Sequence, residues 1–303
     1  MKLPLPTESV QRWASHLRQM AESPRVMAEL PFWREQVGYK KQGRELVLEP
    51  DSWKQATARV GAQPEVSAML RDANPGDTQA ILLTALAWSL SDHLGLERVP
   101  VMVEHHGREL TAGDLDVSRT IGWFTSVFPL LLVAPSHATS VGWRGEGVRQ
   151  LGLVPRNGIG FGILRYLHSD RQIREALATD DRDPWVLFNY LGQLDASGVH
   201  EARSSWTLKR PLAVTTDPTA RPRWWLECHL YQFGDELHAV CDYASPAWDT
   251  HSISRLCDSM WKHVADLIEA DSETSSAAGP DVSTAGLSRS ELDDVLAEFD
   301  QGQ

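Results

Sequence analysis

The sequence predicts an α/β protein, and two observations carry this prediction. The runs Val99–Val103 and Phe128–Val133 are short, apolar and rich in residues that favour strands, so both are expected to be buried strands. A strongly apolar helix predicted at Gln79–Leu94, ended by Gly95, leads directly into the first of these strands. A helix that feeds a buried strand, a pattern repeated later in the chain, is typical of helices packed on a sheet.

The remaining elements follow from periodicity and turn residues. Apolar residues at helical spacing predict further helices, and alternating or β-branched runs predict further strands. Two of these strands are expected to form a hairpin across Gly234-Asp235. The further helices are Thr7–Ala21, Pro24–Val37, Gln63–Arg71, Glu146–Leu153, Ile163–Leu177 and Thr250–Ala270, and the further strands are Glu45–Leu48, Trp185–Tyr190, Trp224–Phe233 and Leu237–Tyr243.

Composition divides the chain into three expected segments. Residues 1–55 should form connecting helices and a linker, and residues 56–271 the main folded lobe. Residues 272–303 begin with a stretch rich in Ser, Thr, Gly and Pro, which predicts a flexible linker, and they end in a short helix at Leu287–Phe299.

Charge and cysteine content narrow the classes of partner. The formal net charge is −12, which argues against a nucleic-acid or anionic-membrane surface. No apolar run approaches the ~20 residues that a membrane span needs. The three cysteines are widely spaced without a CxxC pair, and the amino terminus has no apolar signal region, so we expect reduced thiols in a cytoplasmic protein.

Ionisable residues gather where the first buried strand ends, at Glu104, His105 and His106. Burial at such a position shifts pKa values toward working pH, which suits acid/base chemistry. The adjacent histidines also raise the question of zinc. Successive strand residues point to opposite faces, so the pair is not expected to share one ion, and no metal site is predicted.

Four motifs, in one order, resemble those of the epimerization domains of nonribosomal peptide synthetases. The resemblance covers nearly the whole chain but only part of the family domain. It implies the carboxy-terminal lobe of a chloramphenicol-acetyltransferase-like fold, with a mixed sheet flanked by helices. The motifs are EHHGRE at 104–109 (EGHGRE in the family), SRTIGWFTS at 118–126 (SRTVGWFTS), PRNGIGFG at 155–162 (PxxGxGYG) and FNYLGQ at 188–193 (FNYLGQ).

The resemblance also implies a substrate class and partners. The substrate would be an aminoacyl or peptidyl thioester carried on the phosphopantetheine of a peptidyl carrier protein, with no cofactor bound directly by this chain. Epimerization removes the Cα proton and returns one on the other face, so it needs a base, an acid and donors for the enolate oxygen. A separate first lobe or a neighbouring synthetase domain is the other expected partner.

The resemblance assigns roles to individual residues. Glu104 takes the family's acid/base position, and Asn189 and Tyr190 take the places of its pocket Asn and Tyr. The alternatives are an ion pair of Glu104 with Arg108 or Arg119, core packing for Tyr190 and structural hydrogen bonding for His106. Substrate contacts are expected from His106, Arg108, Arg119, Trp123 and Ser126.

The chain departs from the family at two points. His105 stands where the family has Gly, and a side chain there can crowd a pocket. The HHxxxDG motif, which carries the family's second catalytic group on the first lobe, does not occur in these 303 residues. Two hypotheses remain: the chain is half of an epimerase that a first lobe completes, or it is a catalytically inactive module that binds a carrier protein or partner domain.

Overall fold

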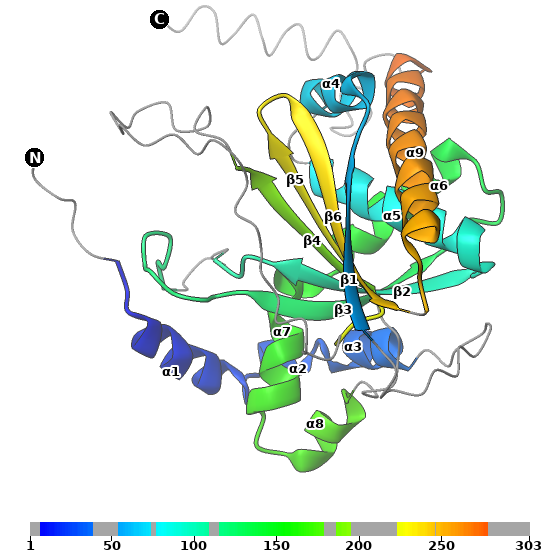
Figure 1. The fold of residues 1–303 in the computed structure, drawn as a ribbon. Coiled ribbons are helices and arrows are strands. Elements are labelled where there is room, and N and C mark those ends of the chain that lie inside the picture. Colours follow the sequence, from blue (N-terminus) through cyan, green and yellow to red (C-terminus); the bar gives the residue numbers. More distant parts are fainter. Residues whose placement is uncertain are drawn as a thin grey trace, which may run out of the picture.

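The computed structural model describes residues 7–38, 54–73, 77–108, 115–178, 186–194, 223–245 and 247–277. They contain a six-stranded sheet in the order β1-β6-β5-β4-β2-β3 (Figure 1). The pairs β2–β4 and β4–β5 are parallel and the other pairs are antiparallel, which confirms the predicted α/β fold with a mixed sheet. The strands are β1 (Lys54–Gly61), β2 (Arg98–His105), β3 (Ser126–Val133), β4 (Val186–Gln193), β5 (Leu226–Phe233) and β6 (Glu236–Ser245).

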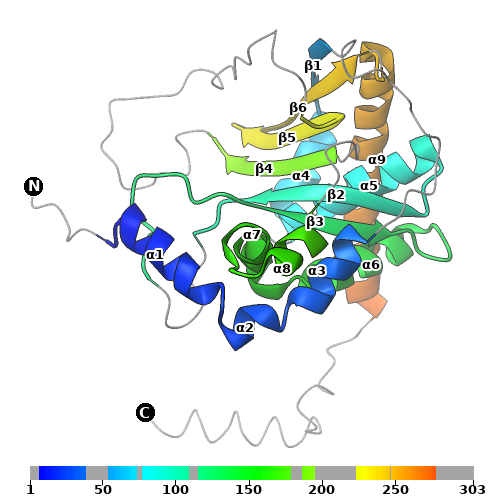
Figure 2. The ribbon, with the colours of Figure 1, turned by 90° about the horizontal axis from the view of Figure 1, so that it is seen from below.

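The helices form two groups. The helices α4, α5, α6 and α9 lie together on one side of the sheet (Figure 1), whereas α3 and α7 lie beside the edge strand β3, and α1, α2 and α8 adjoin the turn at 163–167 that follows α7 (Figure 2). Within the described ranges, no helix has the length and apolar character needed to cross a bilayer. The helices are α1 (Val10–Met20), α2 (Pro24–Met27), α3 (Leu30–Val37), α4 (Pro64–Asp72), α5 (Thr78–Leu94), α6 (Ser140–Gly152), α7 (Ile159–Gly162), α8 (Arg171–Ala176) and α9 (Thr250–Ala277), with short turns η2 (Pro155–Gly158) and η3 (Ile163–Leu167).

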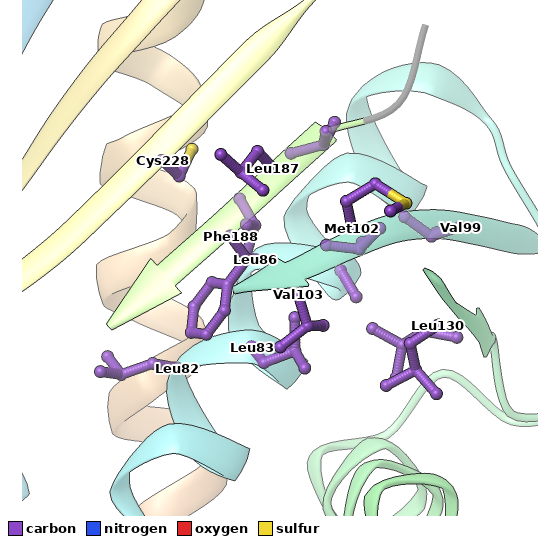
Figure 3. Packing of buried hydrophobic residues seen from close by; sticks show 14 of the residues in the cluster. Leu82, Leu83, Leu86, Val99, Met102, Val103, Leu130, Leu187, Phe188 and Cys228 are labelled. Atoms are coloured by element: carbon purple, nitrogen blue, oxygen red, sulfur yellow. The ribbon is translucent and has the colours of Figure 1, made fainter. Parts of the chain in front are cut away.

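The core lies between the sheet and α5. The side chains of Val103 on β2 and Phe188 on β4 point toward Leu82 and Leu83 on α5, and all four are fully buried (Figure 3). Burying one such side chain contributes about 1.5–3 kcal/mol. Because α5 packs against the sheet and against both α6 and α9, it is apolar on most of its faces, as the sequence predicts.

Two predicted helices are wrong as single helices, and two others are longer than expected. Helix α6, predicted from Glu146, starts at Ser140, where the side chain of Thr139 caps it. Pro24–Val37 divides into α2 and α3, because Pro31 lacks the N–H that a continuous helix needs but fits the first turn of a new one. Ile163–Leu177 breaks at His168, whose backbone is extended, and a new helix starts at the cap Asp170. Helix α9 continues beyond Ala270 to Ala277, since no Gly or Pro occurs in that stretch to end it.

Strand β1 is absent from the sequence-based prediction. Its residues, KQATARVG, are polar or small, and only Ala58 is buried. Its strand structure depends on pairing with β6, a contact between distant parts of the chain that local sequence does not reveal. The predicted strand Glu45–Leu48 and helix Leu287–Phe299 lie outside the described residues.

A close backbone contact fixes the turn after β2. Gly107 has φ 66°, and a Cβ there would lie 1.8 Å from the carbonyl oxygen of Phe124. Only glycine combines this left-handed backbone with so close an approach. The start of the β2–β3 connection is therefore held against its end.

The side chain of Arg108 stabilises the same connection by hydrogen bonds to its backbone. Its Nη1 donates to the carbonyl oxygens of Val117 and Thr120, both at 2.7 Å, and its Nη2 donates to that of Gly122 at 2.9 Å. The guanidinium also lies 4.3 Å from the centre of the Phe124 ring. One rigid planar cation thus organises the segment 117–124.

We predict that Gly107→Ala destabilises the protein more than Gly95→Ala. Gly95 has the same φ of 66° but no heavy atom within 4 Å of an added Cβ, so it isolates the backbone effect, about 1–2 kcal/mol. The contact with Phe124 should add about 1–3 kcal/mol at Gly107. Chemical denaturation of both variants measures the difference, and equal losses would contradict the close contact.

We also predict that Arg108→Lys loosens segment 117–124 and lowers the free energy of unfolding by about 1–3 kcal/mol, since an ammonium cannot satisfy three carbonyls in fork geometry. Arg171→Lys is the matched control, because the side chain of Arg171 is 81% exposed in its ion pair with Glu175. Hydrogen–deuterium exchange should accelerate in 117–124 for the first variant alone. The same protection in both variants would refute the role assigned to Arg108.

Candidate functional site

The candidate site is built on a row of residues that crosses the sheet. In the parallel register, Glu104 on β2 is paired with Asn189 on β4, and Asn189 is paired with His229 on β5. Paired residues of neighbouring strands share a face of the sheet. Because side chains alternate along a strand, this face is the one opposite the Val103 and Phe188 side chains that pack on α5. The fold therefore aligns a carboxylate, an amide and an imidazole on one surface.

A second row adds two carboxylates beside the imidazole. Glu227, two residues before His229, is paired with Asp242 on β6, so both lie on the face of His229. The His229 Nε2 lies 3.6 Å from the Glu227 Oε2. Asp242 is buried and accepts a hydrogen bond from the hydroxyl of Thr57 on β1. Together with Glu104, these side chains make a polar cluster on strands β2, β5 and β6.

Burial and charge shift the titration of these groups. Burial raises the pKa of Glu104 above its usual 4.5; the positive charge of His229 opposes this rise and the negative charge of Glu227 adds to it. Burial alone would lower the pKa of His229, but hydrogen bonding to Glu227 and the charges of Glu227, Asp242 and Glu104 outweigh it and raise the pKa above 6.5. The charges acting on Glu104 thus come from β5, not from Arg108 or Arg119 as the ion-pair alternative supposes.

Tyr190 and Ser126 lie on the other face of the sheet. Tyr190 alternates with Asn189, packs against the apolar core and has its pKa raised by burial. This is the core packing that the sequence leaves open for Tyr190. Ser126 is paired with His105, one position away from the pair that Glu104 forms with Val127. Of the predicted catalytic residues, the structure therefore brings together Glu104 and Asn189.

The remaining predicted contact residues belong to the turn and connection after β2. Arg108 is held by backbone carbonyls, and the exposed His106 accepts a hydrogen bond at its Nδ1 from the backbone N–H of Arg108, as the structural alternative for His106 expects. Arg119 is exposed. Hydrogen bonds from Ser118 lower the pKa of Asp116, and the positive charge of Arg119 lowers it further. Trp123 is 91% exposed. Their contacts with substrate stay a prediction.

The expectation that His105 and His106 diverge is wrong. Their ring centres lie 4.4 Å apart with an interplanar angle of 35°. The strand ends at His105, so the alternation of side chains that separates neighbours in a strand no longer applies to His106.

A possible set of metal ligands lies elsewhere in the site. Glu227, His229 and Asp242 each offer one ligand atom, and these atoms lie within 4.8 Å of one another. Two carboxylates and an imidazole are a donor set that suits a divalent cation such as zinc.

His229, Glu227 and Asp242 are site residues that the sequence-based prediction does not contain. The alternation of Glu227 and His229 along a predicted strand is visible in the sequence and indicates that they share a face. What local sequence does not give is the register that sets β5 beside β4 and β6, which decides that this face is also that of Glu104.

Comparisons with known proteins agree with this architecture. The condensation domain family model matches residues 1–278. A linear gramicidin synthase of Brevibacillus parabrevis is 30% identical over 98% of this chain, and tyrocidine synthase 1 of the same species is 28% identical over 98%. This chain spans 4% and 28% of the length of those two proteins.

Solved structures give the same result. The epimerization domain from the third module of tyrocidine synthetase B superposes with a TM-score of 0.72 at 26% identity, over 88% of this chain and 61% of that domain. The condensation domain of a monacolin K polyketide synthase, at 15% identity and a TM-score of 0.63 over 89% of this chain and 63% of that one, shares the fold. The chain belongs to the condensation domain family of nonribosomal peptide synthetases, in which it resembles the carboxy-terminal lobe of an epimerization domain.

Proposed function

We propose that this chain supplies one wall of the cleft in which an epimerization-type domain acts on a carrier-bound aminoacyl or peptidyl thioester. Glu104 is the acid/base group on that wall, and Asn189 is its neighbour that faces the thioester. The observation that carries the proposal is the alignment of Glu104 with Asn189 on one face, with a carboxyl group whose burial raises its pKa. A raised pKa is the property that a carboxylate base needs to accept a carbon-bound proton.

The chemistry divides between two sides of the substrate. The Glu104 carboxylate removes the Cα proton, and the electron pair moves onto the thioester oxygen as an enolate. The amide N–H groups of Asn189 donate to that oxygen and stabilise its charge. A group on the opposite wall then delivers a proton to the other face of Cα, which inverts the centre.

The opposite wall is expected from a first lobe, either on another chain or elsewhere in a longer protein. Two observations support a missing neighbour. The chain spans 61% of the solved epimerization domain, and Ile121 and Trp123 are 97% and 91% exposed on a loop that Arg108 holds in shape. Large apolar side chains kept in solvent by a rigid loop are typical of an interaction surface. The carrier protein, bearing phosphopantetheine, and a cytoplasmic location belong to the same proposal.

A binding module is the second candidate. It is favoured by the absence of HHxxxDG from these 303 residues and by His105 in the place of a family glycine. In that case the chain docks a carrier protein or a neighbouring domain without turning over a substrate.

Exchange of the Cα proton distinguishes the candidates. The chain is incubated with an aminoacyl carrier protein in deuterated water, with and without a first-lobe protein that carries HHxxxDG, and mass spectrometry measures deuterium at Cα. We expect exchange with the first lobe present, and we expect its rate to fall as the pH drops through the raised pKa of Glu104, because the protonated carboxyl cannot act as a base.

Glu104→Gln should reduce that exchange by about 10²-fold or more. Glu236→Gln is the control, since Glu236 is 71% exposed at the β5–β6 turn and outside the site. Exchange that survives Glu104→Gln would remove Glu104 from the mechanism. No exchange in either arrangement, with carrier-protein binding retained, would leave the binding module as the function.

A further inference from the structure

Three side chains with metal-ligand chemistry lie side by side on the hairpin of β5 and β6. Glu227 and His229 are two residues apart on β5, so they share a face, and Asp242 on β6 is the direct partner of Glu227 in the antiparallel ladder. One ligand atom from each side chain lies within 4.8 Å of the other two. The backbone register of two paired strands therefore brings the three donors together, apart from His105 and His106, for which no shared ion is expected.

The spacing of these donors fits a small divalent ion. A tetrahedral zinc ion with bonds of about 2.0–2.2 Å separates its ligand atoms by roughly 3.4 Å. The Nε2 atom of His229 lies 3.6 Å from the Oε2 atom of Glu227, which is close to that value. The remaining separations, all within 4.8 Å, exceed it by at most about 1.4 Å, a difference that side-chain rotation closes.

Asp242 is a buried carboxylate without a strong cation beside it. It is 7% exposed, and its side chain accepts a hydrogen bond from the neutral hydroxyl of Thr57 on β1. Within the described residues, neither Asp242 nor Glu227 forms an ion pair with a lysine or an arginine. Two carboxylates beside one imidazole carry a net negative charge whether or not that imidazole is protonated. Because buried charges in proteins are paired or coordinate metals, this group has the charge that a divalent cation neutralises.

Thr57 supports the buried ligand. Its hydroxyl donates to the Oδ1 atom of Asp242, which orients the carboxylate and leaves the Oδ2 atom for an ion. Thr57 is also the partner of Asp242 in the β1–β6 ladder, so the backbone register fixes this contact. Hydrogen-bonded neighbours of this kind orient metal ligands and add to metal affinity. The side chains of Glu227 and His229 are 23% and 22% exposed, which gives an ion access from solvent.

We propose that Glu227, His229 and Asp242 form a zinc site with three protein ligands and a fourth position for water, and that the ion ties the β5–β6 hairpin to the edge strand β1 through Thr57 (Figure 1). The imidazole selects zinc over magnesium and calcium, which prefer oxygen ligands. His229 coordinates as a neutral imidazole, and any proton on its Nε2 atom passes to solvent. The site is independent of the proposed function, because zinc binding needs neither a first lobe nor a carrier-bound substrate.

Zinc binding to the metal-free full chain, measured by isothermal titration calorimetry, tests the site. We expect saturable binding of a single equivalent of Zn²⁺. We also expect the melting temperature to rise with zinc concentration, because an ion that binds the folded state stabilises it. Glu227→Gln and His229→Gln each replace one ligand and should weaken binding by about 100-fold or more. No saturable binding to the parent chain, or undiminished binding to both variants, would overturn the proposal.

His238→Gln is the matched control. His238 is 26% exposed and lies 3.5 Å from the carboxylate of Glu236, nearly the same setting as that of His229. In the part of the chain that the structure describes, no third ligand accompanies this pair. We expect His238→Gln to leave the zinc affinity unchanged. A loss as large as that in His229→Gln would refute the assigned ligands.

The supporting contact has its own pair of variants. Thr57→Ala removes the hydroxyl and should weaken zinc binding about 10-fold to 100-fold, whereas Thr57→Ser keeps the hydroxyl and should bind zinc as the parent does. Equal affinity in Thr57→Ala and the parent would refute the support by Thr57. Asp242→Asn should also lose binding. Because this residue is buried, circular dichroism first checks that the variant is folded, and Glu227→Gln and His229→Gln decide the case if it is not.

Cobalt(II) distinguishes this site from the buried thiols, since the Sγ atoms of Cys228 and Cys241 lie 3.6 Å apart. Four nitrogen and oxygen ligands give Co²⁺ strong visible absorption, whereas a thiolate ligand adds a charge-transfer band in the near ultraviolet. We expect the visible bands alone, lost on addition of Zn²⁺ but not of Mg²⁺. A thiolate band would assign the ion to the cysteines, and displacement by equimolar Mg²⁺ would reveal an unselective group of carboxylates; either result would overturn the proposal. A chain that binds zinc here but exchanges no Cα proton would uphold the site and refute only the epimerase function.

Discussion

The alternation of side chains along β2, β4 and β5 is the constraint on which the rest of the structure depends. Val103, Phe188 and Leu230 must face the helices to bury their apolar surface. Their sequence neighbours Glu104, Asn189 and His229 are thereby forced onto the other face, and the parallel register sets them in one line. A slip of one residue would turn an ionisable side chain on β2 or β5, or the amide of Asn189 on β4, toward the helices, so packing of the core also fixes the site.

The motif after β2 stabilises the β2–β3 connection. Gly107 and Arg108, at the start of this connection, both contact its later part. Gly107 does so by a close backbone approach to Phe124, and Arg108 by hydrogen bonds to three carbonyl oxygens. The segment is also tied to the start of α1, where the hydroxyls of Thr7 and Thr120 lie 2.8 Å apart. This bracing keeps Trp123 exposed in a defined position, which a free loop of the same sequence would not do.

Local sequence predicts the elements whose own residues show a clear composition or periodicity. The apolar helix α5, its Gly95 end, strands β2 and β3 and the β5–β6 hairpin follow from composition and periodicity. Strand β1 does not, because it is stabilised by pairing with β6 rather than by its own residues. The site divides in the same way: the motifs identify Glu104 and Asn189, but the side-chain faces separate Tyr190 from them, and cross-strand register adds Glu227, His229 and Asp242.

The charges around Glu104 bear on the acid/base role that we propose for it. Glu104, Glu227 and Asp242 are three carboxylates in a region of limited solvent; burial raises the pKa of Glu104, and the negative charge of Glu227 raises it further. An imidazolium among them offsets part of this repulsion. When Glu104 accepts a proton, His229 loses one of the three anions whose charge raises its pKa. A carboxylate base needs a raised pKa to accept a carbon-bound proton, yet it must also be ionised at the working pH. Burial raises the pKa, and a neighbouring cation keeps part of the carboxylate ionised.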